Sequence, residues 1–119
     1  MGRLTTHVLD TAAGIPARGM RVELHGVAPD QGAPRLLQAF ATTADGRCPA
    51  PLLEDGALVV GRYRLTFHVG AYFRGRGIAL PEPAFFDEVV IAFGIADPRQ
   101  HYHVPLLVSP WSYSTYRGS

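Results

Sequence analysis

The chain has 119 residues, of which 47% are hydrophobic and 18% charged, and its formal net charge is +1. This length suits one domain over residues 1–119, and the near-neutral charge, with no apolar run of about 20 residues, argues against nucleic acid or a membrane as partner. The single cysteine, Cys48, permits no intrachain disulfide, and the amino end lacks the pattern of a secretory signal, so we expect a cytoplasmic protein.

Short alternating segments separated by 13 glycines and 10 prolines predict an all-β fold. We expect eight strands, in chain order Leu4–Asp10, Met20–Gly26, Arg35–Thr42, Pro49–Leu53, Gly61–Val69, Glu88–Ile95, His101–Val108 and Ser112–Arg117. The turns between them fall at Ala13–Ala17, Pro29–Gly32, Asp45–Gly46, Asp55–Gly56 and Asp97–Pro98. Gly70–Arg76 fits a single helical turn, and Pro105 inside a strand indicates a sheet edge, a bulge or a local irregularity. The pattern is typical of a two-sheet β-sandwich with one short helix.

The two-residue period of a strand separates a core face from a polar face near both ends of the chain. His7 points away from the face that is shared by Leu4, Thr6 and Val8. His103 points away from an apolar face formed by Tyr102, Val104, Leu106 and Val108. We therefore expect one sheet to display His7, His103 and Tyr116 on its outer face. The same face carries apolar residues, as expected for a subunit interface that lines a site.

The pair His101 and His103 has a second interpretation as a two-histidine metal clamp, because residues two apart on a strand face the same way. A metal centre would also need a third and a fourth ligand. His7 or a carboxylate would have to supply them, and no cluster of Cys, Asp or Glu stands at ligand spacing. We therefore expect a site without a metal.

The chain lacks the sequence motifs of several common enzyme classes. It has no Gly-x-Ser-x-Gly motif and no glycine-rich phosphate loop before a helix, so we expect no nucleotide cofactor. The groups that remain are two imidazoles, a phenol and the guanidinium of Arg47, which on its own would be a solvated turn charge. Such a set suits the addition of water to a polar carbonyl, in which one group accepts a proton from water and a fixed cation stabilises the developing oxyanion.

Five segments carry a resemblance to a known family: Leu4–Asp10, Pro16–Met20, Asp45–Pro49, His101–Pro110 and Tyr113–Ser119. Together they resemble the 5-hydroxyisourate hydrolases, transthyretin-related enzymes of urate breakdown, whose distinguishing signature matches residues 116–119. The resemblance implies a transthyretin-like sandwich, a hydrolase without a cofactor, and a homotetramer in which neighbouring subunits build each site. It also implies a set of catalytic residues, His7, Arg47, His103 and Tyr116. Ser119 is implied to bind the purine substrate together with His7, Arg47 and Tyr116.

The activity that this resemblance implies is hydrolysis of the N1–C6 amide of 5-hydroxyisourate. The product is 2-oxo-4-hydroxy-4-carboxy-5-ureidoimidazoline, which precedes allantoin. Under this hypothesis His7 or His103 activates water and Arg47 polarises the purine carbonyl. Tyr116 orients the ring or donates a proton. An imidazole with an ordinary pKa of about 6.5 serves as base or acid at neutral pH, so the division of roles between the two histidines stays open.

Two other classes of function compete with the hydrolase. A non-catalytic, transthyretin-like carrier of small ligands predicts apolar or small groups where His7, His103 and Tyr116 stand. A structural β-sandwich that serves as an interaction module predicts no polar constellation near the carboxyl end. The residues present therefore favour the hydrolase.

Overall fold

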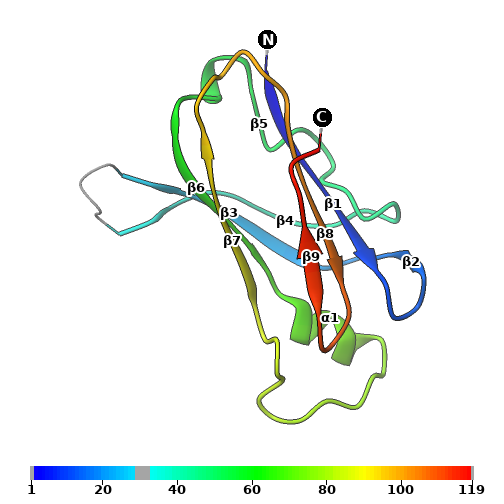
Figure 1. Ribbon diagram of the computed structural model, residues 1–119. Coiled ribbons are helices and arrows are strands. Elements are labelled where there is room, and N and C mark those ends of the chain that lie inside the picture. Colours follow the sequence, from blue (N-terminus) through cyan, green and yellow to red (C-terminus); the bar gives the residue numbers. More distant parts are fainter. Residues whose placement is uncertain (1, 29–32, 119) are drawn as a thin grey trace.

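Two β-sheets packed face to face form the molecule, as shown by the computed structural model, which describes residues 2–28 and 33–118 (Figure 1). The five-stranded sheet comprises β1 (Arg3–Asp10), β2 (Ile15–Pro16), β5 (Leu53–Glu54), β8 (Tyr102–Val108) and β9 (Tyr113–Thr115). Its strand order is β2–β1–β8–β9, with β5 also paired to β1. The four-stranded sheet has the order β4–β3–β6–β7 and comprises β3 (Arg21–Val27), β4 (Arg35–Ala41), β6 (Gly61–Phe67) and β7 (Val89–Ile95). A 3₁₀ turn (Asp55–Ala57) follows β5, and the helix α1 (Val69–Gly75) follows β6.

The inward faces of the two sheets supply the hydrophobic core. Along β1, fully buried residues such as Leu4 and Val8 alternate with half-buried ones. The largest fully buried side chains come from both sheets and from the segments that join them: Phe67, Phe73, Leu4, Met20, Leu24, Leu65, Ile95 and Leu106. Removal of this apolar surface from water holds the sheets together. The predicted all-β, two-sheet fold with one short helix is therefore confirmed.

A buried carboxylate connects α1 to the end of β1. The Asp10 residue is 1% exposed, and its side chain accepts hydrogen bonds from the Tyr72 hydroxyl at 2.9 Å and from the Ala13 backbone N–H at 3.0 Å. Burial raises the pKa of Tyr72 to about 12, and the hydrogen bond and charge of Asp10 contribute to this rise. The phenol therefore remains a hydrogen-bond donor at neutral pH, and α1 stays attached to the five-stranded sheet.

Two short strands of the five-stranded sheet differ from the prediction. The strand β2 forms inside the predicted turn Ala13–Ala17, because Ile15 and Pro16 of this turn pair with the end of β1. The strand β5 has two residues instead of spanning Pro49–Leu53. Prolines at positions 49 and 51 lack the N–H that a sheet ladder uses, so pairing begins only after them. With β2 the described residues contain nine strands, whereas eight were predicted. The predicted turn Pro29–Gly32 lies outside the described residues.

The last strand is also shorter than the predicted Ser112–Arg117. Pairing between β8 and β9 runs from Val108 with Tyr113 to Leu106 with Thr115. Beyond Thr115 the chain continues alongside β8 without a continuous ladder and returns to it through an isolated bridge between His103 and Gly118. Residues 116–118, which we call the tail segment, therefore lie against β8 without forming a strand (Figure 1).

Pro105 lies in an interior strand, because β8 is flanked by β1 and β9. The Pro105 carbonyl accepts a hydrogen bond from the Thr115 hydroxyl, and the His103 carbonyl accepts one from the Gly118 N–H, both at 2.7 Å. In an extended strand the nitrogen and carbonyl of one residue point to the same side, so the missing N–H of Pro105 also faces β9 and the tail segment. Pro105 thus lies where the pairing of β8 with β9 stops. The irregularity that the proline predicted is this interruption of the hydrogen-bond ladder, and not a sheet edge.

Candidate active site

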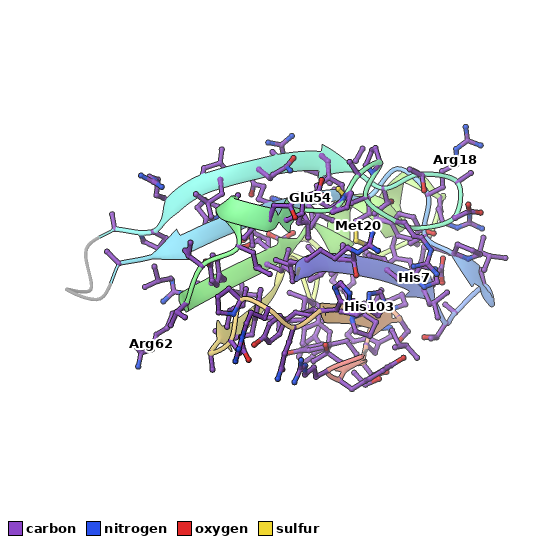
Figure 2. All side chains as sticks on the ribbon, turned by 90° about the horizontal axis from the view of Figure 1, so that it is seen from above. His7, Arg18, Met20, Glu54, Arg62 and His103 are labelled. Atoms are coloured by element: carbon purple, nitrogen blue, oxygen red, sulfur yellow. The ribbon has the colours of Figure 1, made fainter. Side chains whose placement is uncertain are left out.

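Parallel pairing between β1 and β8 brings two histidines together on the outer face of the five-stranded sheet. In this register Thr5 lies opposite His103, and His7 lies opposite Pro105. The two histidines are therefore diagonal neighbours on one face, and both are half-buried. Figure 2 shows their labelled side chains near each other beside β1. The structure thus places His7 and His103 on the outer face, as strand periodicity predicted.

A tight turn places Arg47 beside His7, which strand periodicity did not predict. An isolated bridge joins the two residues, and the Gly46 carbonyl accepts a 2.8 Å hydrogen bond from the Val8 N–H. Gly46 has a φ of 76°, and a Cβ atom there would lie 2.3 Å from the Val8 carbonyl oxygen. Only glycine fits this close approach. The predicted Asp45–Gly46 turn is confirmed, and it holds the exposed Arg47 alongside β1 as the bridge partner of His7.

The electrostatics of the three groups favour neutral imidazoles. Burial lowers the pKa of His7, and the positive charge of Arg47 lowers it further, while a hydrogen bond with the backbone of Asp45 opposes these effects. Burial also lowers the pKa of His103, and repulsion from Arg47 and from His7 adds to this. Because both shifts are downward from 6.5, both rings are predominantly unprotonated at pH 7. Each has one nitrogen that can accept a proton.

The tail segment closes one side of the site at His103. Together with His103, its residues line an open depression of about 660 Å³: Tyr116, Arg117 and Gly118. Tyr116 is 60% exposed, and His7 and Arg47 do not line this depression. His103 is therefore the residue that connects the imidazole pair to the tyrosine. Ser119 lies outside the described residues, so its place at the site stays a prediction.

Arg117 anchors the tail segment to the base of β8. Its guanidinium lies 4.4 Å from the centroid of the Tyr102 ring and donates to the side chain of Gln100 and the backbone carbonyl of His101, each at 3.0 Å. Gly118 then packs on the imidazole of His103, where an added Cβ would lie 2.8 Å from Cδ2. Sequence reasoning left the role of Arg117 open. In the structure, its contacts with Gln100, His101 and Tyr102 hold the tail segment in place.

His101 and His103 lie in different surroundings. His101 is exposed and precedes β8, whereas His103 is half-buried within it. Within residues 2–28 and 33–118, no three His, Cys, Asp or Glu side chains are close enough together to share a metal ion. The donors at the site are two imidazoles next to a guanidinium, whose positive charge disfavours a bound cation.

Thr5 belongs to the site and was not singled out from the sequence. Its hydroxyl oxygen lies 2.8 Å from Nδ1 of His103. The available signal was the two-residue period, which puts Thr5 on the same face as His7. That signal does not identify the partner, because the two bonded residues are 98 positions apart in the chain.

The chain matches the model of the HIUase/Transthyretin family over residues 4–118. It is 57% identical over 119 residues to a 5-hydroxyisourate hydrolase of Ralstonia nicotianae, and the match covers 100% of both chains. It is 48% identical to (S)-allantoin synthase, with a TM-score of 0.93 over 99% of this chain and 44% of that one. Sea bream transthyretin in complex with thyroxine is 26% identical, with a TM-score of 0.86 over 98% of this chain and 94% of that one.

In the part of the chain that the structure describes, no helix has the length and the apolar character needed to cross a membrane.

The family match extends across both sheets and includes His7, Arg47, His103 and Tyr116 within its bounds. The chain therefore belongs to the HIUase/Transthyretin family, as the resemblance of its five sequence segments predicted.

Proposed function

We propose that this chain is a 5-hydroxyisourate hydrolase. The observation that carries the proposal is the grouping of His7 and His103, two half-buried imidazoles, beside the guanidinium of Arg47. A proton acceptor next to a fixed cation is what the addition of water to an amide carbonyl requires. The name of the Ralstonia relative, which matches the chain over its whole length, supports the same reaction.

In the proposed reaction, water attacks C6 of 5-hydroxyisourate and the N1–C6 bond breaks. One of the two neutral imidazoles accepts a proton from the attacking water. Arg47 stabilises the negative charge that develops on the C6 oxygen, and N1 receives a proton as it leaves. Tyr116 lines the depression next to His103, where its phenol can orient the ring or supply that proton. The product is the ring-opened carboxylate 2-oxo-4-hydroxy-4-carboxy-5-ureidoimidazoline.

The direct experiment generates 5-hydroxyisourate with urate oxidase and follows its decay spectroscopically. We expect the purified chain to shorten the lifetime of this compound in proportion to its concentration, and to do so equally well in the presence of a strong chelator. A heat-denatured sample of the same chain is the control for uncatalysed decay. A decay rate that matches this control would show that the protein is not this hydrolase.

Removing the positive charge of Arg47 tests its effect on the two imidazoles. Arg47→Gln is expected to lower turnover by about 10²–10³, the usual cost of losing a group that stabilises an oxyanion. Because Arg47 lowers the pKa values of both histidines, the variant should raise them. Activity that depends on a neutral base is lost as the pH falls through its pKa, so the acid limb of kcat/KM should move to higher pH.

The matched control for this prediction is Arg47→Lys, which keeps the positive charge but loses the planar, two-pronged donor. We expect Arg47→Lys to be slow and yet to keep the acid limb close to its wild-type position. If Arg47→Gln leaves the limb in place while Arg47→Lys moves it, the charge of Arg47 does not act on the histidines as described.

We infer further that four copies of the chain assemble and that neighbouring copies complete each site. Support comes from an exposed aromatic cluster next to β9, in which Phe85 and Trp111 are 65% and 59% exposed and their ring centroids lie 5.6 Å apart. Large exposed apolar groups of this kind are typical of an interface. Light scattering at assay concentration should report a tetramer, and a fully active monomer would contradict a shared site.

The proposed location is the cytoplasm. The chain has a single cysteine, the half-buried Cys48, so its stability does not depend on an intrachain disulfide or on an oxidising compartment. Fractionation of the source cells should recover the protein with cytoplasmic markers. Recovery with an exported fraction would contradict this assignment.

A further inference from the structure

The Thr5 hydroxyl is placed to control the imidazole of His103. Its oxygen lies 2.8 Å from Nδ1, and both side chains are half-buried. The two residues are direct partners in the parallel pairing of β1 and β8. Backbone hydrogen bonds on both strands therefore fix both ends of this contact, and a side chain that is held in this way is pre-organised for its partner.

The contact gives the two ring nitrogens of His103 different roles. A neutral imidazole has one nitrogen that donates and one that accepts a hydrogen bond, and a hydroxyl can serve as the partner of either. With Nδ1 engaged by Thr5, Nε2 is left as the nitrogen that can meet a water or a substrate. Among residues 2–28 and 33–118, the Thr5 contact is the only hydrogen bond found for the ring of His103.

A second contact limits rotation of the same ring. The Cα of Gly118 packs so closely on the imidazole that an added Cβ would lie 2.8 Å from Cδ2 and 3.2 Å from the Cβ of His103. Thr5 thus holds one edge of the ring while Gly118 limits its movement. The charged and titratable groups around it are Arg47 and His7, with Tyr116 and Arg117 lining the adjacent depression.

We propose that Thr5 is a positioning residue whose oxygen accepts a hydrogen bond from Nδ1–H of His103. This hydrogen bond keeps the ring in one rotamer and one tautomer and leaves an unprotonated Nε2 to exchange the proton of the hydrolytic reaction. This inference rests on the proposed function, because proton exchange at Nε2 matters only if the chain hydrolyses its substrate. The hydroxyl of Thr5 itself touches His103 and need not touch the substrate. Its removal should therefore affect turnover more than substrate binding.

The test compares Thr5→Val, which keeps the branched shape but removes the hydroxyl, with Thr5→Ser, which keeps a hydroxyl. We expect Thr5→Val to lower kcat about 10- to 100-fold, as small misplacements of a catalytic group do, and to change KM little. Thr5→Ser should recover most of the lost rate. Nitrogen NMR of the imidazole should show one dominant tautomer for His103 in the wild type and in Thr5→Ser, and a mixture in Thr5→Val.

The matched control is Thr6→Val on the same strand. Thr6 faces the core, where its hydroxyl donates to the Val104 carbonyl at 2.7 Å, so this variant loses a buried hydrogen bond that is remote from the outer face. It should lower thermal stability while leaving kcat and the His103 tautomer unchanged. A general effect of removing a threonine hydroxyl from β1 would appear in both variants.

The outcomes separate this inference from the proposed function. An active wild type with an equally active Thr5→Val variant would overturn the role of Thr5 alone, and a tautomer mixture in the wild type would do the same. If the wild type does not hydrolyse 5-hydroxyisourate, the proposed function fails before Thr5 is considered. If Thr5→Val does not fold, Thr5→Ala is measured in its place, and retention of full activity there would equally overturn the inference.

Discussion

Replacing His103 or His7 with alanine is expected to lower turnover by about 10²–10⁴ while leaving the fold nearly intact. This is the range for loss of a positioned acid or base. Both side chains lie on the outer face of the five-stranded sheet, opposite the buried residues of β1 and β8. Neither truncation opens a cavity in the core, so the free energy of unfolding should change by less than about 1 kcal/mol.

His101→Ala is the matched control for this pair. His101 is exposed, lies two residues from His103, and contacts Arg117 through its backbone carbonyl, which alanine retains. The control should keep nearly full activity. Circular dichroism and denaturant unfolding would establish that each variant is folded before rates are compared. If His103→Ala or His7→Ala keeps most of its activity, or loses it only by unfolding, the role given to that histidine is wrong.

The same variants assign the base. Because the pKa values of both histidines are lowered, the base is neutral at pH 7 and becomes protonated only at more acidic pH. The variant that lacks the base should lose the acid limb of kcat/KM along with most of its rate. The variant that lacks the other histidine should keep that limb. Retention of the limb in both variants would indicate that neither imidazole accepts the proton.

Deleting residues 116–119 is expected to abolish hydrolysis and to leave most of the sandwich folded. The deletion removes the Tyr116 phenol from the depression and the Gly118 N–H that donates to the His103 carbonyl at 2.7 Å. It also removes the stacking of Arg117 on Tyr102. The apolar face of β8 and the ladder to β9 lie before the deletion, so the core keeps its residues.

Three point variants separate the contributions of Tyr116 and Gly118. Tyr116→Phe should bind product-like purines but turn over slowly, because only the hydroxyl is lost. Gly118→Ala places a Cβ 2.8 Å from the His103 ring, so either the tail segment or the imidazole must move. We expect Gly118→Ala to lower kcat while the free energy of unfolding changes little. Tyr116→Thr should also open the site toward the binding of carrier-type ligands.

Circular dichroism, light scattering and steady-state rates, measured for each tail variant, complete this test. A truncated protein that folds, assembles and hydrolyses 5-hydroxyisourate at nearly the wild-type rate would show that residues 116–119 are dispensable. The mechanism would then rest on His7, Arg47 and His103. A truncated protein that does not fold would leave the test to Tyr116→Phe and Gly118→Ala, which keep the chain length.

The local sequence pattern was sufficient to predict the fold class and the direction in which the strand histidines face. Alternation with a period of two is a property of one strand, so it separates His7 from Leu4 and Val8 without knowledge of any other strand. Turn chemistry is equally local, and the Asp45–Gly46 turn was predicted correctly. Two of the segments for which prediction was wrong, β2 and β5, are two-residue strands that exist only because β1 is available to pair with them.

The assembly of the site depends on pairings between distant parts of the chain. The contact of Thr5 with His103 joins residues 98 positions apart, and it follows from the parallel register of β1 and β8. Arg47 reaches His7 because a glycine lets its turn approach β1, and Gly118 reaches His103 because Arg117 is anchored beside β8. A side-chain period carries no information about which strand lies alongside or in which register. Those are decided when the two sheets bury their apolar faces, and the neighbours of His103 are decided with them.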